Sequence, residues 1–82
     1  MKFIYGMHLE RLKNGEFKIK SNKKYTWIIP SKLEKETISK GDIVLAACKN
    51  HKAPVIVLDV FENDDEKIKR KKVIKILDKN KK

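Results

Sequence analysis

The chain has 82 residues, enough for one small domain with a single apolar core. Its 21 Lys and Arg residues outnumber its 11 Asp and Glu residues and give a formal net charge of +10. Such an excess favours polyanionic partners such as nucleic acid. The alternative is that the lysine-rich surface only keeps the protein in solution. Cys48 is the only cysteine, so an internal disulfide is excluded. The sequence begins without a signal peptide and has no membrane-length apolar run, which predicts a cytoplasmic protein.

The amino-terminal part of the chain has the pattern of a β-hairpin. Alternating apolar residues predict a strand over residues 3–9, with Gly6 at a bulge or at a close approach of another backbone. Asn14-Gly15 is a strong signal for a tight hairpin turn, and residues 16–20 form the returning strand. The apolar register slips after the first strand, which predicts a second bulge near Glu10.

A short strand and a helical turn follow. We expect a polar connection over residues 21–24 and a strand over residues 25–29, which is aromatic and β-branched and ends at Pro30. Residues 31–34 (Ser-Lys-Leu-Glu) fit a capping box with Ser31 as the N-cap, so one helical turn is expected there.

The most apolar part of the chain is a hairpin that begins at Gly41-Asp42. Its two strands, residues 43–48 and 54–61, are joined by a polar loop and are apolar on both faces. Such strands belong inside a barrel or a sandwich, and the sequence has no long helix that could cover an open sheet. We therefore predict a mainly β fold: a small five- to six-stranded antiparallel barrel, SH3- or OB-like, with one short helical turn.

The carboxyl-terminal part changes sharply in charge. An acidic loop over residues 62–66 is followed by a basic run, and the β-branched content of residues 71–77 favours a closing strand over a helix. We see no internal repeat and no domain boundary. The expected organisation is a single domain over residues 1–78 and a disordered basic tail over residues 79–82.

Candidate functional residues combine aromatic rings with positive charge. Tyr25 and Trp27 are spaced to share one face, where bases of a single strand could stack on them. The alternative is that Trp27 belongs to the core, which we weight above stacking because large aromatic residues dominate small cores. The loop between the apolar strands and the basic run supply cations for phosphates. The candidate nucleic-acid-binding residues are Tyr25, Trp27, Lys49, His51, Lys52, Lys69, Arg70, Lys71 and Lys72.

No pattern of catalytic or metal-binding residues stands beside them. Cys48 and His51 are close in sequence but lack the surrounding signature of a thiol enzyme. The acidic loop lacks the spacing and the glycine of a calcium-binding loop. Paired carboxylates and a phosphate-binding loop are also missing from the sequence. We expect no enzymatic activity, no metal and no cofactor.

Four motifs of residues 25–78 resemble a known arrangement. They are Tyr25-Thr26-Trp27, Pro30-Ser31-Lys32-Leu33, Gly41-Asp42-Ile43-Val44 and Lys71-Lys72-Val73-Ile74-Lys75-Ile76-Leu77-Asp78. In this order they resemble the amino-terminal DNA-binding domain of the primosomal replication-restart helicase, although Thr26 stands where that family usually has an acidic residue. The resemblance implies a small β-barrel that holds the 3′ end of a DNA strand, with Tyr25 near the terminal base and Lys71 at its phosphate or sugar. The helicase motor has no counterpart, so we expect a stand-alone barrel such as a phage or plasmid encodes.

Two functional hypotheses follow. The first is a non-enzymatic nucleic-acid-binding barrel that contacts single-stranded or end-containing DNA through a basic face with aromatic stacking. The second is a protein-interaction module, an inhibitor or adaptor of a mobile element that docks on an acidic host protein. For this second function, the exposed edge of the strand over residues 3–9 could pair with a partner strand. Neither hypothesis involves a membrane, and both leave the oligomeric state open.

Overall fold

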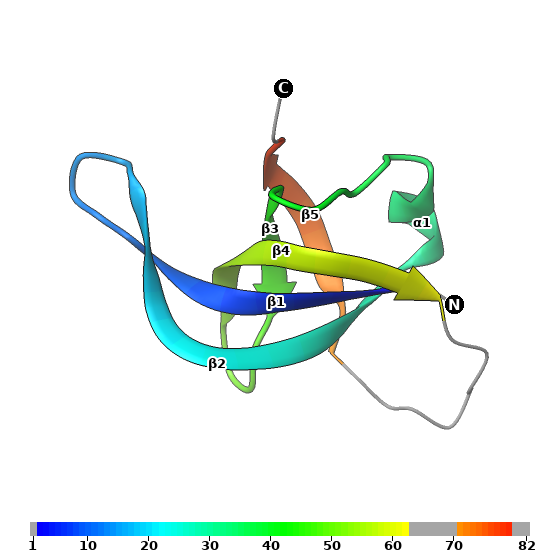
Figure 1. Cartoon of the computed structure of the whole chain (residues 1–82), viewed down its shortest axis with the longest axis horizontal. Helices are drawn as coiled ribbons and strands as arrows, with labels where there is room; N and C mark the ends of the chain where they lie inside the picture. The colour runs from blue at the N-terminus through cyan, green and yellow to red at the C-terminus, as the bar shows by residue number, and fades with distance from the viewer. Residues whose placement is uncertain (1, 63–70, 80–82) are drawn as a thin grey trace.

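The computed structural model describes residues 2–62 and 71–79 (Figure 1). Its five strands form one antiparallel sheet in the order β2-β1-β4-β3-β5, and a single short helix, α1, is present in these ranges. The mainly β fold with one helical turn is therefore confirmed. The elements are β1 (Lys2–Arg11), β2 (Phe17–Ile29), α1 (Ser31–Glu34), β3 (Ile43–Ala47), β4 (Lys52–Glu62) and β5 (Val73–Asp78).

The sheet is not closed into a barrel. Its two outer strands, β2 and β5, approach each other at one point, a parallel bridge between Ile28 and Lys72. There the backbone N–H of Ile28 donates a hydrogen bond to the carbonyl of Lys71 at 2.9 Å. The six residues of β5 cannot pair along the thirteen residues of β2, which bends away toward the β1–β2 turn (Figure 1).

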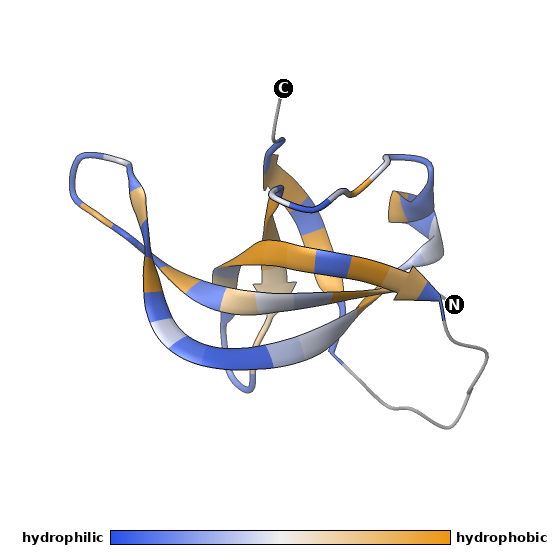
Figure 2. Ribbon diagram, in the orientation of Figure 1, coloured by the Kyte–Doolittle hydropathy of each residue, from blue (hydrophilic) through white to orange (hydrophobic). Residues whose placement is uncertain are grey.

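The main hydrophobic cluster lies on one face of the sheet, while Phe3 and its cross-strand partner Ile28 are buried on the opposite face. Along β3, Val44 and Ala46 are fully buried, whereas Leu45, between them, is half-buried. In β3, one apolar face therefore lies in the core and the other is only partly covered. This differs from the prediction, which placed strands with two apolar faces inside a closed barrel. Strands β3, β4 and β5 are mostly hydrophobic, whereas β1 is mixed and most of the bend of β2 is hydrophilic (Figure 2). The buried cluster comprises Ile4, Trp27, Ile29, Leu33, Ile38, Val44, Ala46, Val55, Val57 and Val73.

The backbone of β4 passes close to Gly6, as a glycine within a strand predicts. The register of β1 against β4 shifts between Tyr5 and Gly6. A Cβ atom at Gly6 would lie 2.5 Å from the carbonyl oxygen of Ile56 and 2.7 Å from Cγ1 of Val55, so only glycine fits. The second irregularity lies at His8, between Met7 and Leu9, two residues before the bulge expected near Glu10.

Three local expectations are wrong. Residues 21–24 continue β2 instead of connecting two strands, and Lys24 pairs with Met7. Ser31 is the first residue of α1 and not its N-cap, because Pro30 occupies that position and no side chain caps the helix. Strand β1 pairs with β2 on one side and with β4 on the other, so residues 3–9 offer no free edge to a partner.

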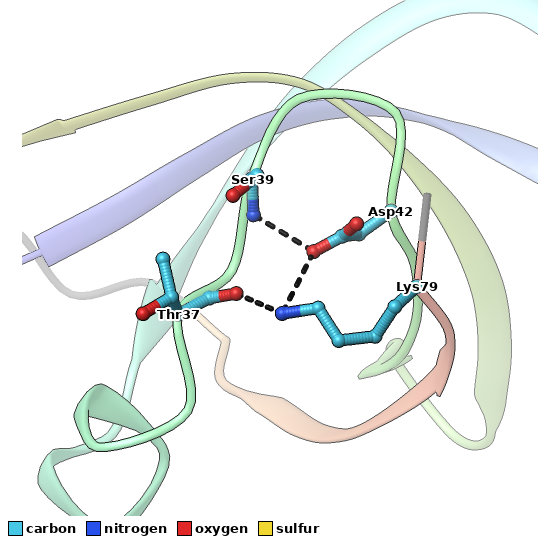
Figure 3. A network of polar contacts seen from close by, with 4 residues as sticks. All are labelled: Thr37, Ser39, Asp42 and Lys79. Carbon is cyan, nitrogen blue, oxygen red and sulfur yellow. Dashed lines mark hydrogen bonds and ion pairs between the residues drawn. The ribbon is translucent and has the colours of Figure 1, made fainter. Parts of the chain in front are cut away.

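The Gly-Asp turn before β3 is fixed by a buried carboxylate (Figure 3). Asp42 is fully buried; its Oδ2 accepts a hydrogen bond from the backbone N–H of Ser39 at 2.8 Å and lies 3.5 Å from Nζ of Lys79. The same ammonium group donates a hydrogen bond to the carbonyl of Thr37. Lys79 therefore belongs to the folded domain and not to a disordered tail, while residues 80–82 lie outside the described residues.

Candidate functional site

A groove of about 490 Å³ opens where the bend of β2, the β3–β4 connection and the start of β5 meet. Backbone hydrogen bonds hold these segments together: the N–H of Cys48 donates to the carbonyl of His51 at 2.7 Å, and the N–H of Ala47 donates to the carbonyl of Lys72 at 3.0 Å. We call this cavity the basic groove. Its lining residues are His8, Lys20, Ser21, Tyr25, Cys48, Lys49, His51 and Lys71.

Positive charge gathers around the basic groove from three parts of the chain. Lys20 comes from β2, Lys49 from the β3–β4 connection and Lys71 from the residues just before β5. None of the lining residues in the described part of the chain is acidic, so among these residues the cations meet no carboxylate in the groove wall. Such a concave surface with one sign of charge attracts an anionic ligand.

The aromatic residue of the basic groove is Tyr25, whose side chain is 44% exposed. The His8 ring meets it at a centroid distance of 5.3 Å and an interplanar angle of 68°. Trp27, which is 3% exposed, contacts both rings, at 5.3 Å from His8 and 6.0 Å from Tyr25, and its indole N–H donates to the carbonyl of Ala47 at 3.0 Å. Trp27 is therefore a core residue beneath the groove, and Tyr25 is the ring available for stacking.

His8 and Cys48 form a second pair within the groove, with Nδ1 of His8 3.9 Å from Sγ of Cys48. Burial raises the pKa of the Cys48 thiol, and nearby Lys71 and Lys20 offset part of this rise. Burial also lowers the pKa of His8, and repulsion from Lys20 and His51 lowers it further. Both shifts favour the neutral forms, so the pair is a thiol beside an imidazole and not an activated thiolate nucleophile.

Four of the predicted residues meet in the basic groove: Tyr25, Lys49, His51 and Lys71. Lys52 and Lys72 are exposed but do not line it, and Trp27 lies in the core. Lys69 and Arg70 lie outside the described residues. The groove residues outside the list of candidates are His8, Lys20, Ser21 and Cys48. Of these, Lys20 could have been found from the sequence: Lys18 and Lys20 alternate with Phe17 and Ile19, which gives the first hairpin a cationic face.

Two other properties of the described residues concern metal ions and membranes. In residues 2–62 and 71–79, no three or more His, Cys, Asp and Glu residues are grouped so that they could hold a metal ion. The same ranges contain no helix with the length and apolar character needed to cross a membrane.

Fold and groove together define a small basic β-sheet domain with an aromatic residue inside a cationic groove. The chain belongs to DUF5839, a family of unknown function, whose model matches residues 1–79. No curated protein and no solved structure matches it. None of these comparisons relates the chain to the primosomal helicase domain, so that resemblance stays a prediction.

Proposed function

We propose that this protein binds single-stranded nucleic acid in the basic groove and does so without enzymatic activity. The observation that carries the proposal is the position of Tyr25. Its half-exposed ring lies among three lysines, and no acidic residue of ranges 2–62 and 71–79 lines the groove. Proteins that bind single strands combine these two features, because bases stack on the aromatic ring while the cations hold the phosphates.

The stacking step explains why the strand must be single. A base inside a duplex has both faces covered by its neighbours, whereas an unpaired base can lay one face on Tyr25. Lys20, Lys49 and Lys71 line the groove from three different segments and supply the cations that bind the phosphates next to the stacked base. Since every base has a flat face, binding of this kind has little sequence preference.

Titration of a fluorescein-labelled oligodeoxythymidine at several salt concentrations tests the proposal. If the three lysines each neutralise one phosphate, log K falls against log[salt] with a slope of about −2, or roughly twentyfold between 50 and 200 mM salt. Lys20→Ala removes one phosphate contact and reduces the slope by about 0.7. The matched control is Lys32→Ala, on the exposed side of α1 and outside the groove, which leaves the slope unchanged.

The proposal fails if the oligonucleotide does not bind at 50 mM salt, or if its affinity is the same at every salt concentration. Equal effects of Lys20→Ala and Lys32→Ala would also contradict it, because binding would then depend on net charge and not on the groove.

A further inference from the structure

A second cavity, of about 310 Å³, shares no lining residue with the basic groove. Four of its six residues are apolar or aromatic, and the other two are cations. We call it the apolar groove. It is lined by Arg11, Phe17, Leu45, Pro54, Lys75 and Leu77.

The sheet register explains how these residues meet. Leu45 alternates with the core residues of β3 and therefore points to the opposite face of the sheet. Its cross-strand partners are Pro54 on β4 and Lys75 on β5, so all three side chains share that face. The turn end of the β1–β2 hairpin adds Arg11, whose guanidinium lies 5.0 Å from the centroid of the Phe17 ring.

An open strand edge runs beside the apolar groove. Strand β5 is the last strand of the sheet and pairs with β3 on one side. Within the described part of the chain, its other side has only the bridge at Lys72, just before the strand begins. Lys75 and Leu77 thus belong both to this edge strand and to the groove wall. An exposed edge of this kind is a template for an added strand.

We propose that β5 and the apolar groove form a docking site for an extended acidic segment of a partner protein. The segment adds a strand along β5 and places an apolar side chain between Leu45, Pro54 and Leu77. Its carboxylates meet Lys75 and Arg11, whose planar guanidinium still has N–H groups to donate while its face lies over Phe17.

Charge selects this occupant over the others. A second copy of the chain would carry the same net charge of +10 and would bring its own Lys75 toward this edge. A nucleic acid would find two cations around an apolar wall, compared with three lysines and the exposed Tyr25 of the basic groove. An acidic strand with apolar residues at alternate positions satisfies both the charge and the apolar wall.

The test uses a fluorescein-labelled ten-residue peptide that alternates aspartate with valine, titrated into the full chain by fluorescence anisotropy. We expect Lys75→Glu and Leu77→Ser each to lower its affinity about fivefold or more. Lys49→Glu, in the basic groove, makes the same charge change as Lys75→Glu. We expect it to keep the peptide affinity within about twofold of wild type, because salt screens charges that are far from the bound peptide. Thermal unfolding of each variant shows that its fold is retained. In the wild-type chain, the bound peptide slows amide exchange along β5.

Four results would overturn the docking proposal. One is the absence of binding at millimolar peptide, and another is equal binding of a peptide with lysine in place of aspartate. A third is loss of binding in Lys49→Glu but not in Lys75→Glu, which would place the peptide in the basic groove. The fourth is a dimer in sedimentation experiments that Leu77→Ser dissociates, because a second copy of the chain would then occupy the edge.

Discussion

Replacing Tyr25 by alanine isolates the contribution of stacking to nucleic-acid binding. Its half-exposed ring is the aromatic surface that the basic groove offers to a base. Stacking of one base on such a ring contributes about 1–3 kcal/mol, so Tyr25→Ala should weaken binding of oligodeoxythymidine by roughly 5- to 150-fold. Because the tyrosine carries no charge at neutral pH, the dependence of affinity on salt should keep its slope.

Two comparison variants make this measurement specific. Tyr25→Phe keeps the ring and should bind within about twofold of wild type, since the stacking face is unchanged. Tyr5 is 38% exposed, close to the 44% of Tyr25, but lies outside the basic groove. Tyr5→Ala should therefore leave the affinity unchanged. Equal losses in Tyr25→Ala and Tyr5→Ala, or an unchanged affinity in Tyr25→Ala, would refute the stacking mechanism, provided that thermal unfolding shows both variants folded.

Further predictions concern the fold and its titrating groups. Gly6→Ala drives a Cβ atom into the backbone of β4, and we expect a loss of about 3 kcal/mol and a fall in Tm of more than about 10 °C in thermal unfolding. Lys79→Met removes the ion pair between the Lys79 ammonium group and the buried Asp42 carboxylate; because Lys79 is 43% exposed, we expect a loss of about 1–2 kcal/mol in urea unfolding, less than for a fully buried pair. Lys20→Ala removes a repulsion and should raise the pKa of His8, as read from its ring signals by NMR. Because the folded-state pKa of His8 is lowered, the unfolded chain protonates first, and stability should fall as the pH drops below the usual histidine range.

The sequence predicted strands correctly where apolar residues form a clear, uninterrupted pattern. The two strands after the Gly-Asp turn were expected from their apolar residues alone, and both are present. The failure at residues 21–24 has a physical reason. Ser21–Lys24 has the composition of a loop, but it continues β2 through an irregularity: Ile19 pairs with Leu9 and Lys24 with Met7, and the residues between them are extra residues of the longer strand. The prediction of a closed barrel was wrong for another reason. The apolar pattern shows which strands are buried, but it does not show whether the two edge strands of the sheet pair along their length.

The candidate site was predictable only in part for a related reason. Tyr25 was found from its aromatic neighbour, and Lys49 and His51 from their place in a polar loop between apolar strands. His8 and Cys48 are 40 positions apart, and their contact depends on the register of three different strands. No spacing in the sequence carries that register, and so the sequence pointed to His51 as the neighbour of Cys48 instead.

Trp27 shows how the core and the basic groove depend on each other. The sequence allowed Trp27 as a second stacking ring but favoured a place in the core, which the structure confirms. Its indole N–H donates a hydrogen bond to the carbonyl of Ala47, one residue before Cys48 and two before Lys49. The same ring packs against His8 and Tyr25. A single buried side chain thus fixes both the β3–β4 connection, which supplies cations, and the ring proposed to take the base. Any substitution that lets Trp27 move should therefore disturb the charged and the aromatic parts of the groove together, so the geometry of the groove depends on the packing of the core.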